Sequence, residues 1–226
     1  MPTNFNSLVK LFSILQLSKE QLLTGYLPAG LRRNDIPSLA DHHYTCSLMG
    51  WLVSEEIKNN GGKINQRKVI LMLMVHDLSE LFGGDIAGPL NRKYPDLREH
   101  KDKIGERAIQ LLSDFLGPKT KQEMELLWQE MEYGKTDEAV VVKILDQMDH
   151  QFFLEHTNYI HNTSEETRSY RPVFVRDHIY ALTERIKDPN TKKVMNDFLS
   201  EFQKNFFDKG HQAMNILMNT DATPTE

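Results

Sequence analysis

The apolar positions of this chain recur mostly at the spacing of an amphipathic α-helix, and short clusters of Gly, Pro and Asn separate the helical segments. Ser38 is a predicted N-cap for a helix over 39–58, which ends at the Asn-Asn-Gly-Gly sequence 59–62. Because no segment shows the alternation of a half-buried strand, the predicted fold class is all-α. Further helices are predicted within 1–17 and over 66–82, 102–115, 120–134, 137–162, 169–186 and 190–207.

Two stretches are predicted to lie outside the helices. The segment 88–103 is highly charged and contains Pro89 and Pro95, which break the helical periodicity, so it is predicted to be a loop. The polar residues 216–226 are predicted to form a disordered tail. A chain of 226 residues is long enough for one sizeable core, and a single domain over 1–215 is expected.

One predicted helix combines an apolar surface with ionisable residues. Six apolar residues, 70–75, lead directly into His76 and Asp77, and Glu80 shares a helical face with both. Burying an ionised carboxylate costs several kcal/mol unless it is paired or bound to a metal. A core histidine bonded to its neighbouring carboxylate is the simpler interpretation. Three ionisable groups on one face of an otherwise apolar helix favour a functional site.

Two other predicted helices place metal-ligand types on apolar faces. His42 lies on the apolar stripe of the first of them, one turn before Cys46, which is predicted to be a small packing residue. Asp146 lies beside apolar neighbours in the long later helix. Taken singly, such a histidine usually packs in a core and such an aspartate usually faces solvent. Together with His76 and Asp77 they form a plausible site for a divalent metal.

The order of these residues resembles the H…HD…D signature of the HD-domain metal-dependent phosphohydrolases. The segments "SLADHHY" and "VHDLSELFGGDIAGP" are similar to those of the 5'-deoxynucleotidase branch, and "KILDQMDHQ" is similar to its final motif. The similarity covers roughly 27–160. It implies a single-domain helical bundle, a possible homodimer, and a metal site made by His42, His76, Asp77 and Asp146.

The resemblance also implies roles for residues near these ligands. Glu80 and Asp85 match the catalytic and substrate-contacting acids, and the sequence leaves open which acid does which job. Arg32 and Arg33 match a region that contacts the nucleotide phosphate, where bidentate guanidinium groups are well suited. An exposed loop with two solvated charges is the alternative for this pair. The same region departs from the family pattern, with Ala29 in place of an Arg and Leu31 in place of a Trp.

Net charge, cysteine content and the positions of the histidines limit which partners and how many metal ions are expected. A net charge of −5 opposes binding to a nucleic-acid polymer, although a local basic pocket could hold one small anion. One cysteine, no long apolar run and no basic leader indicate a cytoplasmic protein outside the membrane. HD enzymes with two metals generally have two further histidines between the HD pair and the last Asp, where this chain has only His100. One divalent transition metal ion is therefore expected, either Mn, Co, Fe, Ni or Zn.

The resemblance implies a hydrolase that removes phosphate from a small phosphomonoester. The expected substrate is a (deoxy)nucleoside 5'-monophosphate, attacked by water that the metal activates. The alternatives are a phosphodiesterase or triphosphohydrolase on the same scaffold. A non-catalytic, metal-stabilised interaction module is a third possibility, suggested by the departures at Ala29 and Leu31.

Overall fold

The computed structural model describes residues 4–29, 31–85, 90, 93–94, 96–157 and 172–204. Within these ranges the chain forms α-helices and short 3-10 helices and contains no β-strand, which confirms the all-α prediction. The helices are α1 (Phe5–Leu15), α2 (Leu39–Asn59), α3 (Gln66–Val75), α5 (Asp96–Ser113), α6 (Pro118–Tyr133), α7 (Asp137–His156), α8 (Pro172–Thr183) and α9 (Pro189–Phe202). The 3-10 helices are η1 (Gln16–Lys19), η2 (Thr24–Ala29), η3 (Arg33–Asp35) and η4 (His76–Glu80).

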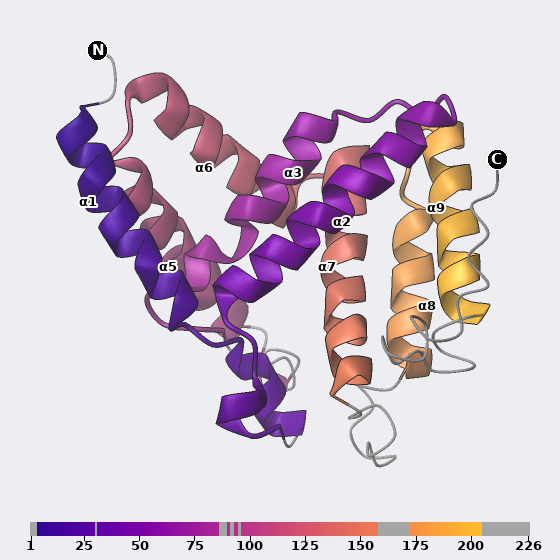
Figure 1. The fold of residues 1–226 in the computed structure, drawn as a ribbon, viewed down its shortest axis with the longest axis horizontal. Helices are drawn as coiled ribbons and strands as arrows, with labels where there is room; N and C mark the ends of the chain where they lie inside the picture. The colour runs from indigo at the N-terminus through magenta and orange to yellow at the C-terminus, as the bar shows by residue number, and fades with distance from the viewer. Residues whose placement is uncertain are drawn as a thin grey trace, which may run out of the picture.

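Helices α2 and α3 lie side by side through the middle of the molecule, and α7 packs against both (Figure 1). Helices α8 and α9 pack together on one side of this centre, where α8 contacts α7 and α9 contacts α2. On the other side, α6 contacts α3 and α7, and α5 contacts α6 and η4. The centre of the bundle therefore joins two consecutive helices, α2 and α3, with α7, which lies much later in the sequence.

The start of α2 is fixed by local hydrogen bonds. The Ser38 hydroxyl accepts a bond from the Asp41 backbone N–H (3.2 Å), and the Asp41 carboxylate accepts one from the Ser38 N–H (3.0 Å). This capping box satisfies two amides that the first helical turn leaves free. The predicted N-cap is confirmed, and it sets His42 in the first turn of α2.

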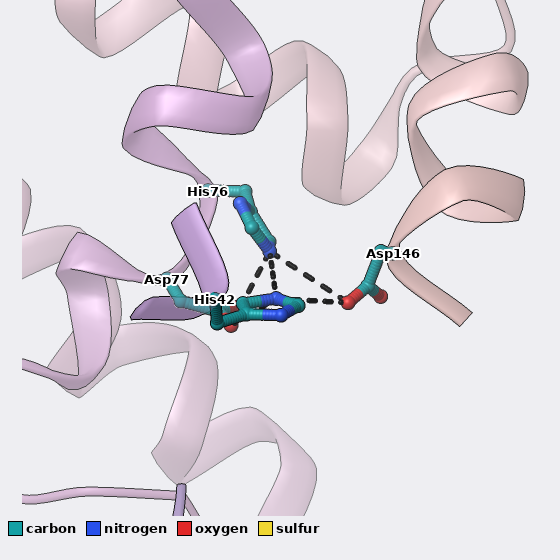
Figure 2. Close-up of side chains that lie close together, drawn as sticks. All are labelled: His42, His76, Asp77 and Asp146. Atoms are coloured by element: carbon teal, nitrogen blue, oxygen red, sulfur yellow. Dashed lines mark hydrogen bonds and ion pairs between the residues drawn. The ribbon is translucent and has the colours of Figure 1, made fainter. Parts of the chain in front are cut away.

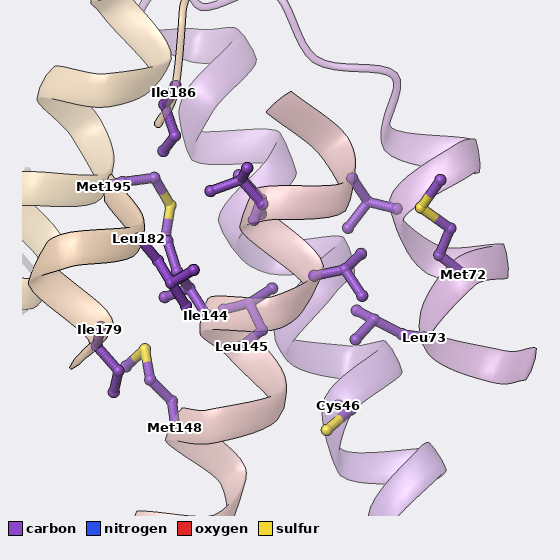
Figure 3. Packing of buried hydrophobic residues seen from close by; sticks show 14 of the residues in the cluster. Cys46, Met72, Leu73, Ile144, Leu145, Met148, Ile179, Leu182, Ile186 and Met195 are labelled. Atoms are coloured by element: carbon purple, nitrogen blue, oxygen red, sulfur yellow. The ribbon is translucent and has the colours of Figure 1, made fainter. Parts of the chain in front are cut away.

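The core consists of two apolar clusters. The first lies between α2, α3, α6, α7, α8 and α9, and Figure 3 shows Ile144 and Leu145 of α7 within it. The second joins α1, η2, α5 and η4 with parts of α2, α6 and α7. Cys46 and Leu145 belong to the first cluster, whereas Leu39 and Leu78 belong to the second. The backbones that carry His42, His76 and Asp146 are therefore anchored in both cores.

Two predicted helix boundaries are wrong. The α-helix expected over 66–82 ends at Val75, and the chain continues as the tighter turn η4. Helix α5 begins at Asp96, inside the segment that was expected to be a loop up to 103. Asp96 and Glu99 lie in its first turn, where the helix dipole favours negatively charged side chains. Charged residues that were expected to belong to a loop therefore stabilise the start of a helix.

Two further predictions concern residues that the structure does not describe. The residues 158–162 of the expected long helix and the polar tail 216–226 lie outside the described residues. None of the helices in the described part of the chain is both long and apolar enough to cross a membrane.

Candidate metal centre

The structure brings together the four residues expected to bind metal. His42 comes from the first turn of α2, His76 and Asp77 from η4, and Asp146 from the middle of α7 (Figure 2). One ligand atom from each lies within 4.8 Å of the others. Such convergence from three elements satisfies the first geometric requirement of a metal site.

The shortest distances join nitrogen and oxygen atoms that bind metals. The Nε2 atoms of His42 and His76 are 3.1 Å apart, and Nε2 of His42 is 3.3 Å from Oδ1 of Asp146. Nε2 of His76 is 3.3 Å from Oδ2 of Asp77. Both rings are buried, whereas the Asp77 and Asp146 side chains keep 21% and 16% of their surface exposed. The cluster is therefore accessible from the side of its carboxylates.

Each imidazole is oriented by a bond on its other nitrogen. Nδ1 of His42 donates to the Asp149 carboxylate (2.7 Å), and Nδ1 of His76 donates to the Leu73 carbonyl oxygen (3.0 Å). A neutral histidine that donates through Nδ1 has its lone pair on Nε2. Two such lone pairs and two carboxylate oxygens then face one another in a buried site. They repel unless a positive charge lies between them, so the donor set fits a divalent cation.

The pKa values of the cluster show the same preference for positive charge. Burial alone would lower the pKa of His42, but hydrogen bonds to Asp146 and Asp149 outweigh burial and raise it well above the usual range. The same competition, with Asp77 and Asp146 as partners, raises the pKa of His76 to about 10. Burial would raise the pKa of Asp77, but the neighbouring His76 holds it below its usual range. Without a metal, protons supply the positive charge that the site requires.

Glu80 and Asp85 lie together beside this cluster. Glu80 is buried, and the Lys101 ammonium is 3.1 Å from its Oε1 and also pairs with Asp85. Burial, reinforced by the charge of Asp77, raises the pKa of Glu80 to about 8 even though Lys101 opposes the shift. A carboxyl group with this pKa retains a proton near neutrality and can donate it.

A glycine turn brings Asp85 toward the segment that precedes α2. Gly84 has a φ of +71°, a conformation that side chains rarely adopt, whereas Gly83 has no such requirement. A Cβ atom on Gly84 would also come within 3.1 Å of the Gln21 side chain. The turn leaves Oδ2 of Asp85 beside Gly25 in η2. The Asp85 carboxylate therefore faces the segment that precedes α2.

Sequence reasoning missed part of the surroundings of the site. His150 lies at the edge of the site, where its Nε2 is 3.2 Å from Oδ1 of Asp146 and its Nδ1 contacts the Tyr26 hydroxyl. Its position one helical turn after Asp146 was the available signal. Lys101 was missed because its segment was predicted to be a loop. Nothing in the local sequence of Tyr26 pointed to this contact.

The two arginines are not held at the site. Arg32 and Arg33 are exposed at the start of η3, and neither has an ion pair or hydrogen bond to a site residue within the described ranges. Leu31, which stands where the family pattern has a Trp, is buried in the second apolar cluster with Tyr26. The phosphate-binding role of both arginines stays a prediction.

Comparisons with known proteins identify the family to which this sequence is similar. The model of the HD domain family matches residues 19–180. The 5'-deoxynucleotidase HDDC2 of Dictyostelium discoideum is 31% identical over 143 residues, which cover 62% of this chain and 72% of that protein. The Homo sapiens 5'-deoxynucleotidase HDDC2 is 23% identical over 199 residues, which cover 88% of each chain.

Solved structures share the fold. A conserved hypothetical protein from Pyrococcus furiosus superposes with a TM-score of 0.65 at 20% identity, covering 87% of this chain and 99% of that one. A predicted metal-dependent phosphohydrolase from Magnetospirillum magnetotacticum has a TM-score of 0.56 at 20% identity, with 88% and 95% covered. At this level of identity the two superpositions establish a common helical architecture.

Proposed function

Because this chain belongs to the HD-domain family, we propose that it is a metal-dependent nucleotide phosphohydrolase whose substrate is a (deoxy)nucleoside 5'-monophosphate. The observation that carries the proposal is the convergence of two Nε2 atoms and two carboxylates from α2, η4 and α7. Both imidazoles use their Nδ1 atoms elsewhere, so the inward nitrogens are available to a cation. The names of the relatives in the 5'-deoxynucleotidase group support the substrate class.

In this proposal His42, His76, Asp77 and Asp146 hold one divalent transition metal ion. When bound there, the ion supplies a Lewis acid that neutralises phosphate charge and makes water a better nucleophile at neutral pH. His100, the only histidine between the HD pair and Asp146, is exposed on α5. This exposure supports a single ion, and Mn, Co, Fe, Ni and Zn all accept such a mixed donor set.

Glu80 is the proposed proton donor to the leaving sugar alkoxide. Its raised pKa, about 8, keeps the proton on the carboxyl group near neutrality, where a general acid requires it. Asp85, which faces η2, is proposed to orient the attacking water or to bind a sugar hydroxyl. Arg32 and Arg33 are proposed to bind the remaining phosphate oxygens, which requires one of these exposed side chains to turn toward bound substrate.

A phosphate-release screen tests the proposal. Chelator-treated protein is supplied with each of the five metals and with deoxy- and ribonucleoside 5'-monophosphates, 3'-monophosphates and triphosphates. We expect metal-dependent release of orthophosphate from 5'-monophosphates. Release of pyrophosphate or tripolyphosphate would instead identify a triphosphohydrolase, and metal retention without turnover would identify an interaction module.

Matched variants locate the activity within the protein. Glu80→Ala is expected to lower kcat by about 100-fold or more, the usual effect of removing a general acid or base. His76→Ala is expected to lose both metal and activity. The control His100→Ala changes an exposed histidine outside the cluster and should behave like the parent protein.

The expected homodimer and cytoplasmic location also stay proposals. The resemblance to the 5'-deoxynucleotidase branch supports the dimer, and light scattering coupled to size-exclusion chromatography would measure the mass. A mass near twice the monomer value of 26.3 kDa is expected.

A further inference from the structure

Lys101 occupies an unusual position on α5. The residues four, seven and eleven positions further along the helix, Gly105, Ala108 and Leu112, are all buried, so Lys101 lies at the start of the face that packs inward. Lysine is rarely placed on such a face unless its charge is compensated. Its surroundings are therefore informative about its role.

The compensation comes from the two acids expected to act on the substrate. Nζ of Lys101 is 3.1 Å from Oε1 of Glu80, and it pairs with Oδ1 of Asp85. Its side chain is 35% exposed, whereas that of Glu80 is only 10% exposed, so Lys101 contacts the acids from the solvent side of the site. Burial would lower the pKa of Lys101, but Glu80 and Asp85 outweigh burial and keep the ammonium charged.

The packing of α5 against η4 determines how far Lys101 can reach. Gly105, one turn after Lys101, lies so close to η4 that a Cβ atom there would be 3.1 Å from Cβ of Ser79 and 3.1 Å from Cζ2 of Trp128. Ser79 directly precedes Glu80. The absence of a side chain at Gly105 allows this approach, which places the Lys101 side chain over the Glu80 carboxyl group.

We propose that Lys101 is a positioning residue whose ammonium group holds the side chains of Glu80 and Asp85 together beside the metal cluster. The inference rests on the proposed function, because Glu80 is the proton donor there. Lys101 acts through these acids and is not proposed to touch the substrate. The outward-facing Lys103, which pairs only with Glu99 among the described residues, provides a matched control on the same helix.

The charges around Glu80 predict the effect of removing Lys101. Asp77 from η4 and Asp85 after the turn both favour the neutral form of Glu80, and Lys101 from α5 is the cation that opposes them. Glu132 from α6 faces Lys101 as a further acid. Replacement of Lys101 by a neutral residue therefore raises the pKa of Glu80 and leaves the Glu80 and Asp85 side chains without the cation that bridges them.

The kinetic test compares Lys101→Gln, Lys101→Met and Lys101→Arg with Lys103→Gln, using a nucleoside 5'-monophosphate across pH 5.5 to 9.5. Each neutral variant is expected to lower kcat about tenfold, equivalent to about 1.4 kcal/mol, with little change in KM. The limb of the pH profile that reports Glu80 should move to higher pH. Lys101→Arg should restore most of the activity because it keeps the charge, and Lys103→Gln should match the parent.

A second measurement does not depend on turnover. Carboxyl ¹³C NMR titration of metal-free protein, with the Glu80 signal assigned by Glu80→Gln, should show a higher Glu80 pKa in Lys101→Gln than in the parent. Lys101→Met replaces Lys101→Gln in this measurement if circular dichroism shows that the latter is unfolded. A Glu80 signal that titrates as in the parent overturns the inference.

The two measurements separate this inference from the proposed function. A parent protein that releases no phosphate with any metal contradicts the proposed function, and the NMR titration then decides the electrostatic role of Lys101 alone. An active parent whose neutral Lys101 variants keep both kcat and the pH profile contradicts the inference while leaving the proposed function intact.

Discussion

At the scale of single residues, Asp149 shows how a side chain outside the ligand set shapes it. Its carboxylate accepts the Nδ1 proton of His42 at 2.7 Å, which directs Nε2 toward His76 and Asp146. Outer-shell carboxylates of this kind orient the ring and increase its basicity as a ligand. Asp149 is itself buried, so water cannot easily replace it as the partner.

Asp149→Ala is therefore expected to weaken metal binding about 10- to 100-fold while all four proposed ligands remain. Competition with a chromogenic chelator measures the affinity. Asp197→Ala is the control, because Asp197 lies on α9 and pairs with the exposed Lys193. An Asp149→Ala protein that binds metal as tightly as the parent would show that His42 needs no support from Asp149.

Glu80 also gives a prediction for stability against pH in the metal-free protein. Its pKa rises from 4.5 to about 8 on folding, so between these values the folded state retains a proton that the unfolded state has lost. The contribution of Glu80 to stability is fully present below about pH 4.5 and is lost as the pH rises through 8. A glutamine has no such dependence.

Each pH unit between the two pKa values changes the stability by about 1.4 kcal/mol, so we expect the parent to lose about 3–4 kcal/mol more stability than Glu80→Gln between pH 5 and pH 8. Urea unfolding of chelator-treated protein at the two pH values measures this difference. Glu106→Gln, at an exposed position on α5, is the control and should follow the parent. Parallel pH dependence in the parent and Glu80→Gln would mean that Glu80 ionises normally in the folded protein.

At the scale of helices, the crossing of α2 and α3 depends on Gly50. A Cβ atom at this position would lie 2.3 Å from Cδ1 of Leu73 and 3.3 Å from Cγ1 of Val69. Leu73 is fully buried and its carbonyl oxygen accepts the His76 Nδ1 proton, so the crossing also supports the site. The two helices approach closely because one of them lacks a side chain at the contact.

Gly50→Val should therefore destabilise the protein by about 1–3 kcal/mol through overpacking. Thermal or urea unfolding of the metal-free protein measures the change. Gly83→Ala is the control, since nothing lies within 4 Å of a Cβ atom there. A neutral effect of Gly50→Val would indicate that Leu73 can adopt another rotamer without loss of packing.

The sequence predicts helices better than it predicts how they end. The capping box at Ser38 is local, so the start of α2 could be read directly from the chain. The transition at Val75 from α-helix to η4 involves no Gly or Pro and depends on packing against α5 and α6, which local patterns do not record. The early start of α5 was not predicted because its first residues are highly charged and resemble a loop sequence. For the same reason the position of Lys101 at the site was not predicted.

At the scale of the whole molecule, the candidate metal centre forms only because the tertiary fold brings α2, η4 and α7 together. The order of His42, His76, Asp77 and Asp146 in the sequence indicated a metal site through a family resemblance, and the fold brings their atoms within 4.8 Å. Glu80 and Asp85 were expected from the same motif, but their link to Lys101 follows only from the docking of α5 on η4. The position of Arg32 and Arg33 relative to bound substrate depends on the ligand itself.

A cation bound at this centre would connect α2, η4 and α7, so we expect metal to stabilise the entire protein. A ligand that binds only the folded state at 100 times its Kd adds about 2.7 kcal/mol, which corresponds to a rise in Tm of about 5–10 °C for a chain of this size. Differential scanning calorimetry of chelator-treated protein, with and without added metal, measures the shift.

The expected rise should disappear in His76→Ala and persist in His100→Ala, because only the first change removes a ligand from the cluster. Elemental analysis of the same samples reports whether metal is bound. Equal stabilisation of the parent and His76→Ala would place the metal elsewhere in the protein. Absence of both bound metal and stabilisation in the parent would show that protons, rather than a metal ion, neutralise the two carboxylates, which is the alternative that the raised histidine pKa values provide.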